Sequence, residues 1–193
     1  MNNEEIENTA KLKNVLMLDI ETSGQNPGCR VMTLGAAGFS ANGEYCEFYR
    51  RFDPVKLREA GFHDDVSTMD WWRKQTKEAF TEAFGGEDDP KEGIAAFKLF
   101  CYEHFKMQNG DGFQVWCCGL DFDFPILKEF LRHYGHHFPW KFWEQYDYRT
   151  LKNIFPRIRN AEGNQAAHSA IEDARAQLRG LEEFFLSKKD GML

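Results

Sequence analysis

Two carboxylates lie two residues apart at the end of the most apolar segment of this 193-residue chain. Residues 14–20 read NVLMLDI, which is typical of a central strand covered on both faces, and Asp19 and Glu21 fall at its end. Alternate residues of a strand project from one face, so the two carboxylates are expected side by side. Because like charges held together are costly, a hard divalent cation is their natural partner. An exposed pair at a strand end is the alternative that this spacing leaves open.

A third carboxylate is expected in the segment GLDFDFPIL, which follows the strand-like run 113–118. Asp123 lies at the end of this strand and at the start of a helix that we predict from Pro125 to Tyr134. An acid there also stabilises the helix dipole by about 0.3 to 1 kcal/mol without any further function. Asp121 is an equal candidate on spacing alone, because strand alternation would put both side chains on one face.

The segment HSAIED, residues 168–173, supplies a histidine and a fourth carboxylate. Ser169 and Glu172 have the spacing of a capping box, which predicts that a helix starts after Ser169 and that Glu172 bonds to its backbone. His168 then lies on a turn outside the helix, while Asp173 in the first turn can face the sheet. A titratable imidazole beside such a carboxylate suits a general base next to a metal ligand.

The elements that must position these residues indicate an α/β domain with a mixed sheet. Asn42-Gly43 between two strand-like runs is a strong hairpin signal, so the first three strands follow one another and at least two are antiparallel. A helix is expected to begin at Ser67, an amphipathic helix runs from Lys91, and a last helix carries an apolar stripe. We expect a polar leader, a single domain and a short tail at residues 1–13, 14–187 and 188–193.

Composition limits the partners and the compartment. The chain has 24 basic and 31 acidic side chains, a net charge of −7, so a nucleic acid would have to be held by a local basic patch or by bound metal. The apolar runs are shorter than the roughly 20 residues that span a bilayer, and the N-terminus does not resemble a signal peptide. Five irregularly spaced cysteines predict reduced thiols in a cytoplasmic protein that binds no membrane.

Two further features bear on a nucleic-acid partner. Trp71 and Trp72 are neighbours in an expected helix and point about 100° apart. One of them is expected in the core and the other at an edge, where it would stack a base or meet a second subunit of a homodimer. Four basic residues then stand without an acid between Tyr148 and Ala161, and they form either a solvated face or a phosphate contact. They are Arg149, Lys152, Arg157 and Arg159.

Taken in order, DIET, GLDFD and HSAIED resemble the three motifs of the DEDDh 3′–5′ exonucleases, the superfamily of RNase T and the bacterial polymerase proofreading subunit. The likeness runs from about Asn14 to Phe185 and is greatest to a small bacterial and phage-type branch. The branch segments DLETMG, WW, WGNGxxFD and RTL correspond here to DIETSG, Trp71-Trp72, WCCGLDFD and Arg149-Thr150-Leu151. The resemblance implies a ribonuclease-H-like fold, with an antiparallel start to a mixed sheet and flanking helices, and it selects Asp123 rather than Asp121.

The resemblance also implies a metal-dependent 3′–5′ exonuclease that releases nucleoside 5′-monophosphates from a free 3′ end of DNA or RNA. Two Mg²⁺ or Mn²⁺ ions about 4 Å apart would be held by four carboxylates, with His168 as general base. The implied ligands are Asp19, Glu21, Asp123 and Asp173, and the expected substrate contacts are Thr22, Ser23, Phe122, Arg149, Arg157 and Arg159. Ser23 replaces a larger apolar residue of the branch and Cys118 replaces an amide, which bears on substrate preference. The alternatives are an inactive binding module of the same fold and an endonuclease of the ribonuclease H type.

Overall fold

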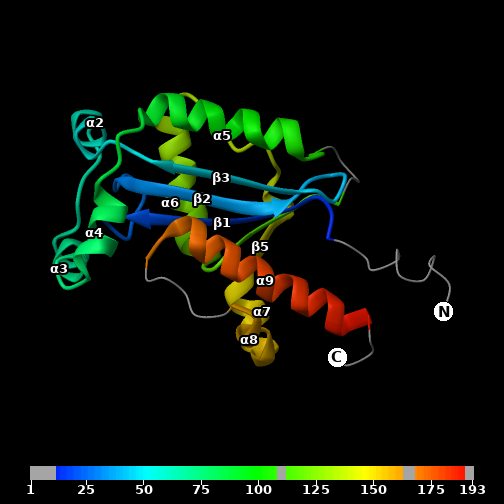
Figure 1. Cartoon of the computed structure of the whole chain (residues 1–193). Helices are drawn as coiled ribbons and strands as arrows, with labels where there is room; N and C mark the ends of the chain where they lie inside the picture. Colours follow the sequence, from blue (N-terminus) through cyan, green and yellow to red (C-terminus); the bar gives the residue numbers. More distant parts are fainter. Residues whose placement is uncertain (1–11, 108–111, 163–167, 190–193) are drawn as a thin grey trace.

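The fold is built on a five-stranded mixed sheet with helices on both faces (Figure 1). The computed structural model describes residues 12–107, 112–162 and 168–189. Three strands come first, β1 (Val15–Thr22), β2 (Val31–Phe39) and β3 (Tyr45–Arg51), and they pair antiparallel in succession. Strands β4 (Gln114–Cys117) and β5 (Gln145–Asp147) then extend the sheet parallel to β1, which gives the order β3-β2-β1-β4-β5. The predicted α/β class with an antiparallel start to the sheet is therefore confirmed.

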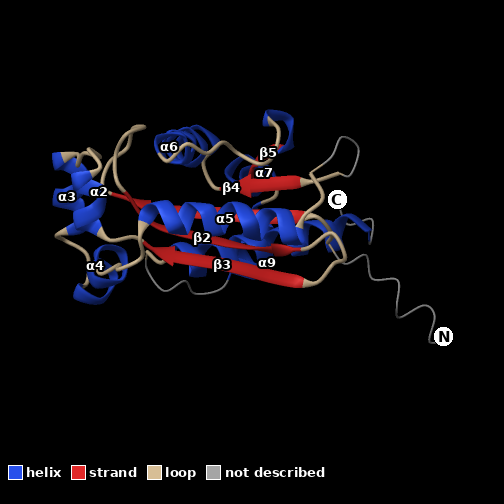
Figure 2. Cartoon of the chain, turned by 90° about the horizontal axis from the view of Figure 1, so that it is seen from above, coloured by secondary structure: helices blue, strands red, loops and turns tan. Residues whose placement is uncertain are grey.

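Two helices cover one face of the sheet. They are α5 (Pro90–His104) and α6 (Leu120–His133), and Figure 2 shows α5 lying lengthwise over the strands. The alternate β1 residues Leu16, Leu18 and Ile20 pack into this core with Ile94 and Phe97 of α5. The apolar residues whose spacing predicted the α5 helix thus face the sheet, as the 3.6-residue period of an amphipathic helix requires.

The opposite face is covered chiefly by the last helix, α9 (Ala170–Lys189), which packs on β1 and β2. Leu178 and Leu181 of its apolar stripe join Val15 and Met17 of β1 in a second core. The short elements between β5 and α9 flank this core. They are α7 (Tyr148–Ile154), η2 (Pro156–Ile158) and α8 (Arg159–Glu162), while η1 (Phe142–Glu144) precedes β5.

Three short helices gather at the end of the sheet where β1 finishes (Figure 1). These are α2 (Pro54–Glu59), α3 (Val66–Trp72) and α4 (Lys77–Phe84). The prediction that a helix begins at Ser67 is wrong, because Asp65 is the N-cap of α3 and Ser67 lies inside it. A separate helix, α4, follows after Thr76, whose side chain caps it. Helix α2 and the three-residue β5 are too short to leave a periodic signal in the sequence.

The helix predicted from Pro125 starts five residues earlier, at Leu120. Gly119 has a φ of +143°, a conformation that suits glycine, and it turns the chain from β4 straight into α6. The position of this turn matters for function because it moves Asp121 and Asp123 from an expected strand end onto a helix.

The Asn42-Gly43 hairpin is confirmed. Gly43 adopts a φ of +81° between β2 and β3, and all five cysteines are free. Across the described ranges, helices long and apolar enough to cross a membrane are absent.

Candidate active site

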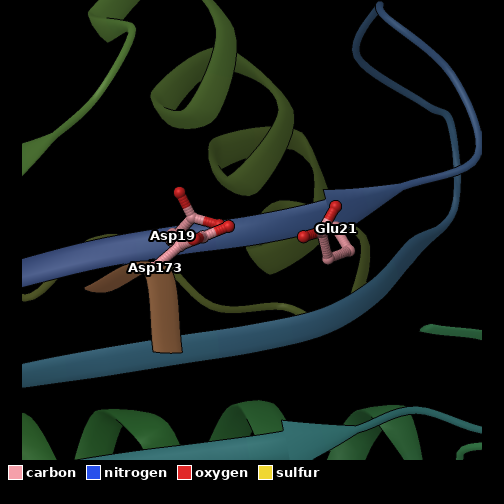
Figure 3. Close-up of side chains that lie close together, drawn as sticks. All are labelled: Asp19, Glu21 and Asp173. Atoms are coloured by element: carbon pink, nitrogen blue, oxygen red, sulfur yellow. The ribbon is translucent and has the colours of Figure 1, made fainter. Parts of the chain in front are cut away.

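Three carboxylates converge where β1 ends and α9 begins (Figure 3). Asp19 and Glu21 continue the β1 face that carries Val15 and Met17, so alternation along the strand directs them toward α9. Asp173 reaches them from the first turn of α9. One oxygen from each of the three carboxylates lies within 4.8 Å of the others. The strand face predicted from spacing and the helix turn predicted from HSAIED thus meet at one place.

A glycine opposite Asp19 permits this meeting. Gly35 of β2 pairs with Asp19 across the antiparallel ladder, and the start of α9 lies directly over it. A Cβ atom at Gly35 would collide with the backbone of Ala170 and Ile171, because the helix approaches the strand that closely. The helix start is therefore seated beside Asp19. A glycine inside a buried strand is the sequence signal for such a close backbone approach.

Asp123 comes to the same region from the first turn of α6. Its side chain is buried, whereas Asp121 is exposed, because residues two apart on a helix point to nearly opposite sides. The Cys117 thiol donates a hydrogen bond to the Asp123 carboxylate, and the Arg149 guanidinium lies nearby. Asp123 is not one of the three clustered carboxylates, yet its charge is close enough to act on both Asp19 and Glu21.

The four carboxyl groups share a raised proton affinity. Burial, reinforced by the neighbouring carboxylates, raises the pKa of Asp19 well above its ordinary value and that of Glu21 to about 8. Burial is also the main cause that raises the pKa of Asp123 to about 7 and that of Asp173 to about 6. Like charges in a partly dry site favour protonation unless a cation replaces the protons. The electrostatics therefore suit a divalent cation.

A carboxylate oxygen that lacks a hydrogen-bond partner supports the same conclusion. Oδ1 of Asp173 is buried and has no hydrogen-bond partner in the described ranges. Carboxylate oxygens are the ligands that Mg²⁺ and other hard cations prefer. The donor set present here, all carboxylate oxygen, fits such a cation.

Sequence reasoning missed Gln177, which lies one helical turn after Asp173 on α9. Its Nε2 donates to Oδ1 of Asp19 over 3.1 Å, while its own Oε1 is buried and unpartnered within the described part of the chain. The bond joins residues 158 positions apart. The spacing of four residues from Asp173 on the same helix face is the signal that would have found it.

His168 lies on the turn immediately before α9, as predicted. Its backbone φ is +63°, and its ring packs edge-on against Trp71 and Trp72 with centroid separations of 4.7 and 5.8 Å. Partial burial lowers the pKa of His168 below its ordinary value. Burial thus favours the neutral imidazole, the form that can accept a proton.

The start of α9 agrees with the prediction, but the partner of Glu172 does not. The Asp173 N–H donates to the Ser169 carbonyl over 2.9 Å, which puts Ser169 at the N-cap position. The Glu172 carboxylate, however, accepts a hydrogen bond from Arg175, which also binds Glu47 of β3. An ion pair to the next helical turn has thus replaced the expected capping box.

A pocket of about 430 Å³ adjoins the carboxylates. Glu21, Thr22 and Phe122 line it, together with Trp71 and Trp72 of α3. Of the two tryptophans, Trp72 is buried and Trp71 is 42% exposed, so the predicted division between core and edge is confirmed. Two of the predicted substrate contacts, Thr22 and Phe122, thus line this pocket.

Ser23, a predicted substrate contact, is buried in the structure. Its side chain is fully buried, its hydroxyl donates to the His63 carbonyl, and it accepts the Arg30 N–H. Strand β1 ends at Thr22, after a register shift between Glu21 and Thr22, so Ser23 does not continue the alternation that carries Asp19 and Glu21. The Ser23 hydroxyl is thus engaged within the protein, and its contact with substrate stays a prediction.

The basic residues between Tyr148 and Ala161 differ in their distance from the site. Arg149 is exposed in the first turn of α7, close to Asp123, and donates to the Cys118 carbonyl over 2.6 Å. Lys152 pairs with Glu162, and Arg159 donates to Asn153, while Arg157 is exposed on η2. Arg149 thus lies close enough to act on Asp123, and Lys152 of α7 close enough to act on Asp173, while Arg157 and Arg159 lie on η2 and α8.

The family model described as the 3′-5′ exoribonuclease Rv2179c-like domain matches residues 14–185. The chain belongs to this family. An exodeoxyribonuclease of Enterobacteria phage T4 is 30% identical over an alignment of 162 positions, and the match covers 69% of this chain and 68% of the phage protein. Membership of the Rv2179c-like family and similarity to the phage protein together support a 3′–5′ exonuclease, and they confirm the resemblance drawn from the three motifs.

Solved structures share the fold at low sequence identity. Cell-death related nuclease 4 matches with a TM-score of 0.57 and 16% identity over 89% of this chain and 63% of its own. Exonuclease X, solved with 5′ overhanging duplex DNA, gives a TM-score of 0.55 and 12% identity, and the match covers 92% of this chain and 93% of exonuclease X. E. coli exonuclease I, solved with a dA16 oligonucleotide, gives a TM-score of 0.61 and 13% identity. The match covers 91% of this chain and 40% of exonuclease I, so the Rv2179c-like chain spans less than half of that protein.

Proposed function

We propose that this chain is a metal-dependent 3′–5′ exonuclease that hydrolyses the last phosphodiester of a nucleic acid and releases a nucleoside 5′-monophosphate. The observation that carries the proposal is the meeting of Asp19, Glu21 and Asp173 beside Asp123, with His168 and a pocket of about 430 Å³ at the same end of the sheet. Family membership supports the reaction class.

The four carboxylates would hold two divalent cations, Mg²⁺ or Mn²⁺. Bound there, the cations would supply Lewis-acid activation of water and neutralise charge on the phosphate. Gln177 fixes the orientation of Asp19 through its amide, so at least one of the oxygens is preset before a cation arrives. The four acids also explain how an acidic chain approaches a polyanion, because bound cations reverse the local charge.

His168 acts as the general base in this proposal. The water that attacks the terminal phosphodiester would lose its proton to the imidazole, whose neutral form burial favours by lowering the pKa of His168. The leaving group is the 3′ oxygen of the shortened strand. Glu172 takes no part in this chemistry, because Arg175 engages its carboxylate.

The pocket would receive the 3′-terminal nucleotide. Thr22 and Phe122 line it between the carboxylates and α3, and Trp71 offers an exposed aromatic surface on which a base can stack. Arg149, the basic side chain next to Asp123, is the candidate for a phosphate contact. We assign the substrate as DNA or RNA with a free 3′ end.

An oligonucleotide labelled at its 5′ end tests the proposal. With Mg²⁺ or Mn²⁺ we expect a ladder of products shortened one nucleotide at a time, with 5′-mononucleotides released, and no reaction in EDTA. A circular single strand of the same sequence is the matched control, because it has no 3′ end. Cleavage of the circle would indicate an endonuclease, and binding without hydrolysis would indicate an inactive module. Parallel reactions on DNA and RNA of one sequence identify the preferred sugar.

A further inference from the structure

Helix α3 lies between the pocket and His168 and is attached to the end of β1. Trp72 is buried, and its indole Nε1 donates to the Thr22 carbonyl over 2.8 Å. This bond joins α3 to the strand that carries Asp19 and Glu21. The position of Trp71, the next residue along the helix, is therefore set relative to the carboxylates.

Trp71 contacts two parts of the site at once. Its ring lines the pocket and is 42% exposed, although the residue is aromatic and large. The same ring stands edge-on to the His168 imidazole, with centroids 4.7 Å apart and planes at 78°. A single side chain thus separates the expected site of the terminal base from the expected general base.

His168 needs support from its neighbours because its own backbone is strained. A φ of +63° is unfavourable for a residue other than glycine. Such conformations persist only where the surrounding structure holds them. The ring contacts that the structure shows for His168 come from Trp71 and Trp72, and of these Trp71 is the nearer.

We propose that Trp71 is a positioning residue that couples occupancy of the pocket by the terminal base to the placement of His168. This inference rests on the proposed function. A base stacked in the pocket would restrict the exposed indole, and the restricted indole would hold the imidazole in place through its edge-on contact. Hydrolysis would then be fastest for strands whose last nucleotide carries a base.

A simpler role for Trp71 makes a different prediction. If it were only a stacking surface, its loss would weaken binding by the worth of one stacked base, a rise of about 5- to 150-fold in KM. The kcat at saturating substrate would then be unchanged. A positioning role lowers kcat as well, and it does so only while His168 is present.

A double-mutant cycle separates the two roles. We would measure kcat and KM for the wild type, Trp71→Ala, His168→Ala and the double variant on one single-stranded oligonucleotide. Side chains in contact show coupling of about 2- to 150-fold, so Trp71→Ala should lower kcat by a factor in that range. In the His168→Ala background the same change should leave kcat within about twofold. If Trp71→Ala lowered kcat by the same factor in the wild type and in the His168→Ala variant, or changed KM alone, the inference would be overturned.

The substrate offers a second readout. Oligonucleotides ending in a normal nucleotide or in an abasic tetrahydrofuran residue differ only in the terminal base. The wild type should show a higher kcat on the base-bearing strand, and Trp71→Ala should abolish that difference. An equal kcat on both strands for the wild type would contradict coupling.

Controls keep the inference distinct from the proposed function. Trp71→Phe retains an aromatic edge and should restore most of the kcat, and Trp143→Ala removes a tryptophan that is 55% exposed and lies outside the pocket. Circular dichroism checks folding, and Trp71→Leu replaces the alanine variant if that one fails to fold. A wild type that degrades no 3′ end would contradict the proposed function. If the wild type is active but the effects of Trp71→Ala and His168→Ala on kcat are independent, only the role of Trp71 is contradicted.

Discussion

Asp19 is the residue with the most neighbours of like charge. Glu21, Asp123 and Asp173 all raise its pKa, and burial adds to their effect. Gln177 lowers the pKa of Asp19 through one hydrogen bond. A carboxylate in such surroundings is retained at a cost in stability, which is expected of a functional group and not of a structural one.

Replacing Asp19 with Asn should therefore separate activity from stability. The variant should lose nearly all hydrolysis because a metal ligand is gone, yet in EDTA it should unfold at a higher temperature than the wild type, since repulsion is relieved. Thermal unfolding by circular dichroism and a nuclease assay on the same samples check both halves. A lower unfolding temperature in EDTA would contradict the electrostatic account.

His168 and Glu172 provide a contrast within one short segment. His168→Ala should reduce kcat by about 10² to 10⁴, the usual worth of positioned proton transfer, with little effect on the free energy of unfolding. Glu172→Ala removes a partly exposed ion pair with Arg175 and should cost at most about 1 kcal/mol while leaving turnover intact.

Steady-state kinetics with denaturant titrations of both variants check this contrast. If Glu172→Ala were as inactive as Asp173→Ala, the assignment of the ligand on α9 would have to change. If His168→Ala kept full activity, another group would be the base.

At the scale of elements, the seating of α9 on the sheet decides whether the site assembles. Its first turn rests on Gly35 and brings Asp173 to Asp19, and its second turn brings Gln177. Farther along, Gly180 lies against the ring of Tyr148, so two glycines mark the closest approaches of this helix. A shift of the helix start would move two of the site's side chains together.

Gly35→Ala should accordingly impair both folding and catalysis. The new methyl group meets the backbone of Ala170 and Ile171, which cannot rotate away, so we expect a loss of about 1 to 3 kcal/mol of stability and a marked fall in kcat. Gly61→Ala is the control, because its Cβ would enter open space while its φ of +91° brings only backbone strain. That control should be destabilised by about 1 to 2 kcal/mol with kcat unchanged. Normal kcat in Gly35→Ala would show that α9 can shift without disturbing the site.

For the molecule as a whole, the four carboxyl groups link stability to pH and to metal. Their folded-state pKa values are raised, with Asp173 at about 6 and Glu21 at about 8. At a pH between the ordinary pKa of a carboxyl group and its raised pKa in the folded state, the folded protein holds a proton that the unfolded chain has released. This contribution to stability is therefore fully present at low pH and is lost as pH rises toward about 8.

In EDTA, the free energy of unfolding gained by Asp19→Asn over the wild type should grow as pH rises from about 5 to about 8. Mg²⁺ should stabilise the wild type more at pH 8 than at pH 5, because the cation binds deprotonated ligands of the folded state. Denaturant titrations at each pH, with and without Mg²⁺, check the trend. A Mg²⁺ effect that is independent of pH would contradict ligation by these groups.

Local spacing was sufficient for the features that depend on neighbouring residues alone. The period of two along β1 predicted that Asp19 and Glu21 share a face, and the stripe along α9 predicted which side of that helix meets the sheet. The three motifs in order indicated the family. The strand and helix patterns repeat over a few residues, so they can be read without knowing what lies opposite.

Only the tertiary structure decided the features that depend on distant partners. Asp121 and Asp123 could not be separated by spacing, because the turn at Gly119 had to begin α6 before one became exposed and the other buried. The bond from Gln177 to Asp19 and the contact of Trp71 with His168 each join residues about a hundred or more positions apart. Such contacts arise when separate elements pack together, and no periodicity within one segment encodes them.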